Sequence, residues 1–403
     1  MMRSLVGRAA SVLPEPVAER LLPWKRSAFR SAGVATVKKA ERRLLIGPVN
    51  SAGQAHEWAR AASAMPRTSA ANVMFRREGD AFSFPADQSV PEIYAVTNRR
   101  WQHAQSRAVA RFTHVLIESG RRMLGPGGAV RDDIRFFGRK GLRVGLVWHG
   151  SDIRIPTIHA RTEPDSPFQD GGYVDQGRLE EIALRNLDLA IGSGLPNFVS
   201  TPDLLHFLPD ATWLPVVVDL AMWEAAATRR VLERDIPVVV HAPSRAGLKG
   251  TDMITASLRR MHADGRVDYR EVTGVPASQM PAVYGDADIV LDQFSLGIYG
   301  VAACEAMAAG RVVISHVSDR VRDAVHSRTG RSLPIVESRA GELEQVLGTV
   351  IDDRAEARRV ADRGRSFVAH AHDGSLSRAA LEPFLAGFGV HGQELVGDLN
   401  GVR

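Results

Sequence analysis

The fold of this chain is indicated most clearly by the stretch VVVHAPSRAGLKGTDMI, residues 238–254. Its β-branched run predicts a buried strand, and Thr251 or Asp252 would cap the helix that follows. The loop between them holds two glycines and two cations, Arg245 and Lys249. A helix N-terminus beside a basic loop favours a bound anion, because its free N–H groups and the cations both attract negative charge. The other interpretation is an ordinary strand–helix turn with two solvated cations.

Short apolar runs alternate with longer amphipathic segments on both sides of this stretch, from Arg43 onward. The first series predicts strands at 44–49, 72–75, 113–117, 143–148 and 187–192, and helices from Gln54 to Ala64 and from Leu179 to Asn186. The second series predicts strands at 236–242, 268–272, 288–292, 311–315 and 334–336, and helices near 251–263, 299–309, 340–351 and 354–369. Such alternation is typical of an α/β protein whose parallel sheets carry helices on both faces.

The chain has 403 residues, which is enough for two such doubly wound units. The segment WLPVVVD, at 213–219, ends the first series and indicates a domain boundary. We therefore expect a first Rossmann-like domain over 43–215, a second over 216–377, and a C-terminal helix over 378–403 that packs back on the first. Ligands of such sheets bind outside the carboxyl ends of the strands, so the expected site is a central cleft that both domains face.

Composition and charge exclude several classes of protein. The sequence is 44% hydrophobic and 24% charged, as in soluble globular proteins. It has no apolar run near the ~20 residues of a membrane span. Its single cysteine, Cys304, excludes an internal disulfide framework and fits a reducing cytosol. Residues 1–43 hold ten Lys/Arg against three Asp/Glu, so the basic charge belongs to an N-terminal arm, 1–42.

The composition of this arm leaves two interpretations open. Its leucines, tryptophan and phenylalanine lie beside cations, which suits the surface of an anionic bilayer. A loosely packed N-terminus without a binding role explains the same residues. Because the rest of the chain carries a net charge of about −2, we expect no nucleic acid as a partner.

A second informative stretch covers residues 286–317, DADIVLDQFSLGIYGVAACEAMAAGRVVISHV. A predicted strand leads into a loop with Gly297 and Gly300, where the missing side chains let the backbone approach a ligand closely. Glu305 lies a little over one turn inside the next helix, and its carboxylate could accept hydrogen bonds from both hydroxyls of a ribose. The alternative is a solvated surface glutamate, which the small apolar segment AMAAG after it disfavours.

Both stretches resemble the nucleotide-sugar half of glycosyltransferases with the GT-B fold, most closely the large retaining family 4 (glycosyl transferase group 1). The matching segments are HAPSRAGLKGTDMI and YGVAACEAMAAGRVVI. In the first domain, RVGLVWHGSDIR at 143–154 resembles an element that places a histidine near the donor sugar. GPVNSAGQAHEW at 47–58 resembles the glycine-containing loop after the first strand. The resemblance covers about residues 43–390 and implies two Rossmann-like domains that face a cleft.

This resemblance also implies roles for individual residues. Arg245 and Lys249 would hold the donor diphosphate, Glu305 the ribose, and His149 the sugar near the bond that breaks. We predict that His149, Arg245 and Lys249 are the catalytic residues. The predicted donor-binding residues are Gly53, Ser244, Asp292, Gly297, Ile298, Tyr299, Gly300 and Glu305.

One position departs from the family pattern. Many members carry an acidic residue eight positions before the glutamate, where it meets the donor sugar, and Gly297 stands there in this chain. Asp292, the nearest carboxylate, could substitute for it, or backbone amides of the glycine loop could face the sugar instead. This departure motivates the alternative function, a catalytically weak or inactive GT-B protein that binds a nucleotide sugar or a glycan.

The implied reaction transfers a sugar from a UDP- or GDP-linked donor, with retention, to an unidentified acceptor such as a glycan, a lipid or a small molecule. Arg245, Lys249 and helix amides would stabilise the leaving diphosphate, so neither a metal nor a further cofactor is expected. Asp286 and Asp288 look like a metal-binding pair, but they directly precede a predicted buried strand, so we expect no metal there. The expected location is cytoplasmic, with peripheral contact between the arm and the inner face of the membrane.

Overall fold

The computed structural model describes residues 32–77, 79–80, 82–124 and 129–387. Most of the predicted basic arm (1–31) and much of the predicted C-terminal helix (388–403) lie outside the described residues. The chain divides into two compact units. The first unit consists of Met1–Asp80, Pro85–Val147 and Glu382–Arg403, and the second of Ala81–Phe84 and Trp148–Leu381.

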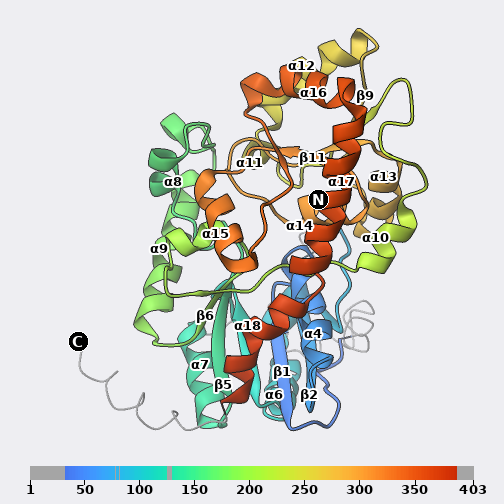
Figure 1. The fold of residues 1–403 in the computed structure, drawn as a ribbon. Coiled ribbons are helices and arrows are strands. Elements are labelled where there is room, and N and C mark those ends of the chain that lie inside the picture. Colours follow the sequence, from blue (N-terminus) through green and yellow to red (C-terminus); the bar gives the residue numbers. More distant parts are fainter. Residues whose placement is uncertain (1–31, 78, 81, 125–128, 388–403) are drawn as a thin grey trace, which may run out of the picture. The chain divides into compact units, whose positions relative to one another are not determined.

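The first unit is built on a parallel sheet with the strand order β3-β2-β1-β4-β5. The strands are β1 (Arg42–Gly47), β2 (Thr68–Arg76), β3 (Gln88–Pro91), β4 (His114–Glu118) and β5 (Arg143–Trp148). The helices are α4 (Gln54–Ser63), α5 (Glu92–Thr97), α6 (Arg99–Val109) and α7 (Val130–Arg139), of which Figure 1 labels α4, α6 and α7. All five residues of β4 are buried, which is expected of a central parallel strand that is covered on both faces.

The second unit begins with a helical segment and two short strands. Its helices here are α8 (Pro156–Thr162), α9 (Gln176–Gly192) and α10 (Leu220–Ala226), and β6 (Asn197–Val199) pairs in parallel with β7 (Thr212–Trp213). The predicted strand at 187–192 is wrong, because these residues form the end of α9. Ala183, Asn186, Leu189 and Ala190 are buried at helical spacing, and a short apolar run alone does not separate a strand from a buried helix.

A five-stranded parallel sheet forms the rest of the second unit, in the order β12-β11-β10-β8-β9. The strands are β8 (Val238–His241), β9 (Asp268–Glu271), β10 (Ile289–Leu291), β11 (Val312–Ser315) and β12 (Val336–Glu337). The helices are α11 (Ala246–Lys249), α12 (Thr251–Ala263), α13 (Met280–Asp286), α14 (Val301–Ala308), α15 (Asp319–Thr329), α16 (Leu343–Asp352) and α17 (Arg354–Ala371). The last helix, α18 (Ser375–Ala386), begins in the second unit, and its residues from Glu382 on belong to the first. Each predicted strand and helix of this series overlaps an observed one.

The core of the second sheet lies between its strands and the helices α12, α16 and α17. Val239, Ile289 and Ile314 face Ile254 and Leu347 in one buried cluster. Helix α17 also packs along α14, as Figure 1 shows. This packing fixes the helices that start at the carboxyl ends of β8 and β10. No helix among the described residues combines the length and the apolar character needed to cross a membrane.

The predicted side-chain cap at the start of α12 is wrong. Gly250 is the N-cap residue, with φ 71° and no side-chain cap. Thr251 already lies inside the helix, and its hydroxyl is 2.9 Å from Nε2 of the buried His241. A glycine takes the left-handed conformation at this tight junction without steric cost, and the threonine hydroxyl is then used by the histidine.

Candidate functional site

The two sequence stretches that carry the predicted site meet at the carboxyl ends of neighbouring strands. Strand β8 pairs with β10 in parallel, so the loops that follow them lie side by side. The carbonyl oxygen of Lys249 accepts a hydrogen bond of 2.9 Å from the Phe294 amide. The Ser295 hydroxyl donates to the Leu248 carbonyl oxygen at 2.8 Å. These two hydrogen bonds join the loop after β8 to the loop after β10, so the two loops form one continuous surface at the sheet edge.

Lys249 is held at this edge by a buried carboxylate. Its ammonium group donates a hydrogen bond to Oδ1 of Asp292, whose side chain is 1% exposed. The other oxygen, Oδ2, is buried without a hydrogen-bond partner among the described residues. An ammonium group has three N–H donors, so Lys249 can bind Asp292 and still donate to an anion. Asp292, which was predicted to substitute for an acid at position 297, is therefore bound to the lysine of the predicted diphosphate site.

The second predicted cation stands free on the surface. Arg245 is the exposed N-cap residue of α11 and makes no ion pair with any described residue. Ser244 beside it is also exposed. Neither α12 nor α14, the helices that follow the two loops, has a side-chain cap. Uncapped helix N-termini next to Lys249 and Arg245 give this edge the character of an anion site.

A buried glutamine fixes the shape of the second loop. Gln293 is 1% exposed, and its Oε1 accepts a hydrogen bond of 2.7 Å from the Leu296 amide. Its Nε2 donates to the carbonyl oxygens of Ile298 and His316. No sequence argument had selected Gln293, and only the contacts in the folded chain reveal this bracing role.

The glycine loop, residues 297–300, can contact a ligand mainly through its backbone. Gly297 has φ 63°, a left-handed conformation that glycine adopts most readily, and Gly300 is the N-cap residue of α14. Ile298 is half-buried. Tyr299 points inward, with 2% of its surface exposed and its hydroxyl 3.3 Å from Nε2 of His372. Tyr299 can therefore contact a ligand through its backbone but not through its ring.

Glu305 lies on the second turn of α14 and is half-buried. Burial and, after it, the charge of Glu305 raise the pKa of the Tyr284 hydroxyl well above its usual value. Glu305 is therefore close enough to the buried Tyr284 for its charge to act on that hydroxyl. Its role toward a ribose stays a prediction.

The last two predicted residues, His149 and Gly53, lie outside the loops after β8 and β10. His149 follows β5 in the second unit, and its backbone N–H donates to both carboxylate oxygens of Asp152 at 3.0 Å. Gly53 belongs to the first unit, where it is buried at the start of α4 with φ 77°. A glycine loop after β1 is therefore present where the sequence predicted it.

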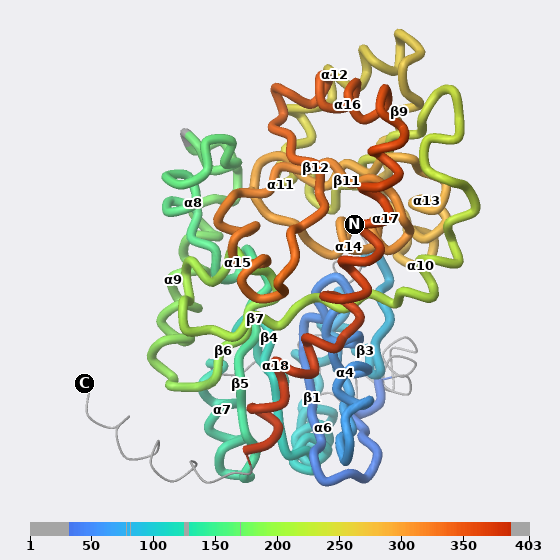
Figure 2. Tube along the Cα trace, in the orientation of Figure 1, coloured from blue at the N-terminus to red at the C-terminus, as the bar shows by residue number. Residues whose placement is uncertain are grey.

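The segment from α8 to Tyr173 packs on both motif loops, which the sequence did not reveal. Phe168 forms an apolar cluster with Leu248 of α11 and Leu296 of the glycine loop. Figure 2 shows that α8 and α11 lie near each other in space, although they are far apart in the sequence. Burial lowers the pKa of His159 in α8 to about 4, so its ring is neutral. The ring nitrogen Nε2 lies 3.2 Å from the Leu296 carbonyl oxygen, to which it must donate because that oxygen can only accept.

A histidine between two glutamates lies next to the glycine loop. His316 is 4% exposed, with Nδ1 2.6 Å from Oε1 of Glu337 and Nε2 3.3 Å from Oε2 of Glu163. Burial opposes the charged ring, but hydrogen bonds with both carboxylates outweigh it and raise the pKa of His316 to about 9. The ring is therefore an imidazolium at neutral pH, and it holds Glu163 against the loop.

We expect His316 to make the stability of the protein depend on pH above neutrality. A pKa raised from 6.5 to about 9 contributes stability that is fully present below pH 6.5 and is lost as the pH rises through about 9. Replacing His316 by asparagine should lower the free energy of unfolding by up to about 3 kcal/mol near pH 6 and by little near pH 10. Urea unfolding of both proteins across this range measures the difference, and a difference that does not change with pH would contradict the assignment.

Asp286 and Asp288 are held by arginines and backbone amides. Asp288 accepts hydrogen bonds from the Leu232 and Val238 amides at 2.7 and 2.9 Å, and Asp286 pairs with Arg234 and Arg270. Among the described residues, no three His, Cys, Asp or Glu side chains are grouped so that they could hold a metal ion. These contacts give the two aspartates a structural role.

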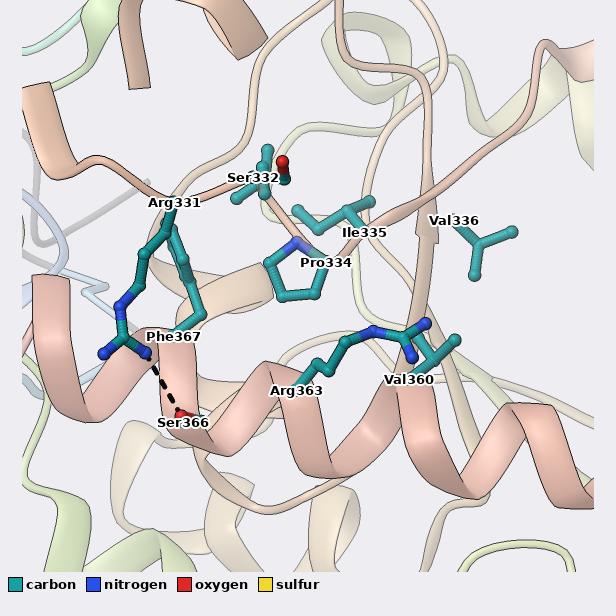
Figure 3. A pocket seen from close by; sticks show the side chains of 10 residues that line it. Arg331, Ser332, Pro334, Ile335, Val336, Val360, Arg363, Ser366 and Phe367 are labelled. Atoms are coloured by element: carbon teal, nitrogen blue, oxygen red, sulfur yellow. Dashed lines mark hydrogen bonds between the residues drawn. The ribbon is translucent and has the colours of Figure 1, made fainter. Parts of the chain in front are cut away.

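One cavity in the described part of the chain lies away from the predicted site. It has a volume of about 590 Å³ and is bounded by the segment before β12 and by α17. Figure 3 shows Pro334, Ile335 and Phe367 at its walls and the Arg331 guanidinium directed to Ser366, 3.2 Å away. None of the predicted site residues lines it. The predicted donor residues are therefore separate from this cavity.

Comparison with known proteins gives matches in fold but not in sequence. No protein-family profile and no curated protein matches the chain. Anabaena Alr3699/HepE, solved with UDP-glucose, matches with a TM-score of 0.54 and 11% identity, over 86% of this chain and 100% of the other. Sucrose-phosphate synthase from Thermosynechococcus elongatus gives 0.53 and 13%, over 86% and 100%. A glycosyltransferase from Rickettsia africae gives 0.51 and 9%, over 90% and 100%.

These matching structures are glycosyltransferases with the GT-B fold. The fold class predicted from the sequence, α/β with two parallel sheets of the GT-B type, is therefore confirmed. The chain has the fold of nucleotide-sugar glycosyltransferases.

Proposed function

We propose that this protein is a glycosyltransferase that moves a sugar from a nucleotide-diphosphate sugar to an acceptor. The observation that carries the proposal is the pair of loops after β8 and β10, where Lys249, Arg245 and two uncapped helix N-termini gather at one sheet edge. This is the chemistry that binds a diphosphate. The fold shared with Alr3699/HepE, which was solved with UDP-glucose, supports a donor of this class.

In the proposed reaction, the bond between the anomeric carbon and the diphosphate oxygen breaks, and its electron pair stays on that oxygen. Lys249, Arg245 and the loop amides stabilise the developing charge without a metal. An acceptor hydroxyl bonds to the anomeric carbon on the face that the diphosphate leaves, which retains the configuration, and its proton passes to the leaving oxygen. His149 orients the sugar, and Glu305 holds the ribose. We assign donor binding to the second sheet and acceptor binding to the first.

A release assay tests the proposal directly. We expect the purified protein to bind UDP or GDP and to release it slowly from a UDP- or GDP-linked hexose in the absence of an acceptor. EDTA should leave the rate of nucleotide release unchanged, because Lys249 and Arg245 would stabilise the diphosphate in place of a metal ion. Nucleotide binding without any release would support the alternative of an inactive binding protein. Absence of both binding and release would contradict the proposal.

We further propose a cytoplasmic enzyme whose basic arm contacts the inner face of the membrane. The excess of seven positive charges in residues 1–43 supports this location, because each Lys or Arg near an anionic surface adds about 1 kcal/mol of attraction. Deleting residues 2–31 should abolish sedimentation with phosphatidylserine vesicles and leave nucleotide release unchanged. Equal sedimentation of the two proteins would contradict the membrane contact.

A further inference from the structure

The carboxylate of Glu163 lies in the space that a side chain at position 297 would fill. A Cβ atom placed on Gly297 would be 2.9 Å from the carboxyl carbon of Glu163, and 2.9 and 3.0 Å from its oxygens. Glu163 directly follows α8, far from the glycine loop in the sequence. The glycine loop therefore has a carboxylate at this position, and it comes from another segment of the chain.

One oxygen of this carboxylate is anchored, while the other remains available. Oε2 accepts the hydrogen bond of the His316 ring at 3.3 Å. Oε1 makes no hydrogen bond within the described part of the chain, and the Glu163 side chain keeps 15% of its surface exposed. A cavity of about 20 Å³ lies here and is lined by Glu163, His159 and Gly297 among others. That volume is enough for one water molecule or one hydroxyl group.

The position of Glu163 relative to the loop is fixed by packing and hydrogen bonds. His159, one turn earlier in α8, binds the carbonyl oxygen of Leu296, the residue before Gly297. Phe168, a few residues later, packs on Leu248 and Leu296. The segment that carries Glu163 is thus attached to both loops of the proposed donor site, so its carboxylate is held in place before a ligand binds.

We infer that Glu163 binds hydroxyl groups of the donor sugar and replaces the acid that position 297 lacks. This inference rests on the proposed function. A carboxylate next to the glycine loop is suited to accept hydrogen bonds from sugar hydroxyls. Glu163 should therefore strengthen the binding of a nucleotide sugar but not that of the free nucleoside diphosphate, which lacks the hexose.

The test compares two glutamates that share His316 as a partner. Glu163→Gln should weaken binding of the nucleotide sugar about 10- to 100-fold, the usual effect of losing hydrogen bonds to a charged group. Binding of UDP or GDP alone should change less than about 2-fold, because these ligands lack the sugar whose hydroxyl groups Glu163 would bind. The control is Glu337→Gln, which removes the other carboxylate on His316 but does not face Gly297. It should leave the ratio of the two dissociation constants unchanged.

A rescue variant tests whether misfolding, and not the lost carboxylate, causes the weaker binding. Glu163→Ala empties the space beside Gly297, and adding Gly297→Asp returns a carboxylate to it from the loop. Asp tolerates a positive φ better than most residues. The double variant should bind the nucleotide sugar at least about 5-fold more tightly than Glu163→Ala alone, since a charged hydrogen bond is restored.

Three outcomes separate this inference from the proposed function. A wild-type protein that binds neither UDP, GDP nor their sugars would overturn both. A wild-type protein that binds them, with a Glu163→Gln variant whose ratio of dissociation constants is unchanged, would overturn only the inference. A selective loss of nucleotide-sugar binding in Glu163→Gln, without that loss in Glu337→Gln, would support it.

Discussion

Replacing Lys249 by methionine is expected to lower kcat/KM for the nucleotide sugar by about 30- to 1000-fold, which corresponds to ~2–4 kcal/mol of transition-state stabilisation. The charge on the leaving diphosphate grows as the sugar–phosphate bond breaks, and an ammonium group fixed beside it binds that state most tightly. Methionine keeps most of the length of the lysine side chain and removes its charge and its hydrogen-bond donors. Steady-state release of the nucleoside diphosphate measures the effect.

Lys249 also neutralises Asp292, so a second variant is needed to separate the two roles. Leaving Asp292 buried without its partner should cost about 3–5 kcal/mol of folding free energy. Lys249→Met with Asp292→Asn should regain most of that stability and remain inactive. Activity restored in the double variant would show that Lys249 only balances Asp292. Arg259→Met, an exposed cation of α12 outside the loops, is the control and should leave kcat/KM unchanged.

Replacing Asp288 by asparagine is expected to lower the free energy of unfolding by about 2–4 kcal/mol, because a buried charged acceptor of two amides is lost. The Asp288 side chain is 1% exposed and also pairs with Arg234. Urea unfolding measures the loss.

The neighbouring aspartate provides the matched control for this experiment. Asp286 is 42% exposed, and Asp286→Asn should cost no more than about 1 kcal/mol, as exposed ion pairs usually do. A stable Asp288→Asn variant that loses activity and regains it with added divalent metal would favour a metal site and contradict the structural role.

The fold was largely predictable because parallel strands covered on both faces have a clear sequence pattern. Strands β8 and β10 are short apolar runs bounded by loops, and each was predicted within a few residues. The error at 187–192 shows the limit of the pattern. A run of apolar residues at the end of α9 fits a buried strand and a buried helix face equally well, and only the tertiary contacts of Leu189 and Ala190 decide between them.

The candidate site was predictable only where its residues lie close together along the chain. Lys249, Gly297 and Glu305 belong to two short stretches whose strands pair directly, and the loops meet as expected. Glu163 could not be found in this way. Its partner His316 is 153 residues away, and its place beside Gly297 depends on how α8 packs on the loops. Likewise, the sequence contains Asp292 but does not show that its carboxylate binds Lys249.

Hydrogen–deuterium exchange with bound nucleotide tests the central claim, that the loops after β8 and β10 form the donor site. Saturating UDP or GDP, whichever the protein binds, should slow the exchange of backbone amides in residues 244–252 and 297–303. The segment 331–336 beside the large cavity should be unaffected. Slower exchange confined to 331–336, or no change in either loop, would contradict the assignment of the donor site.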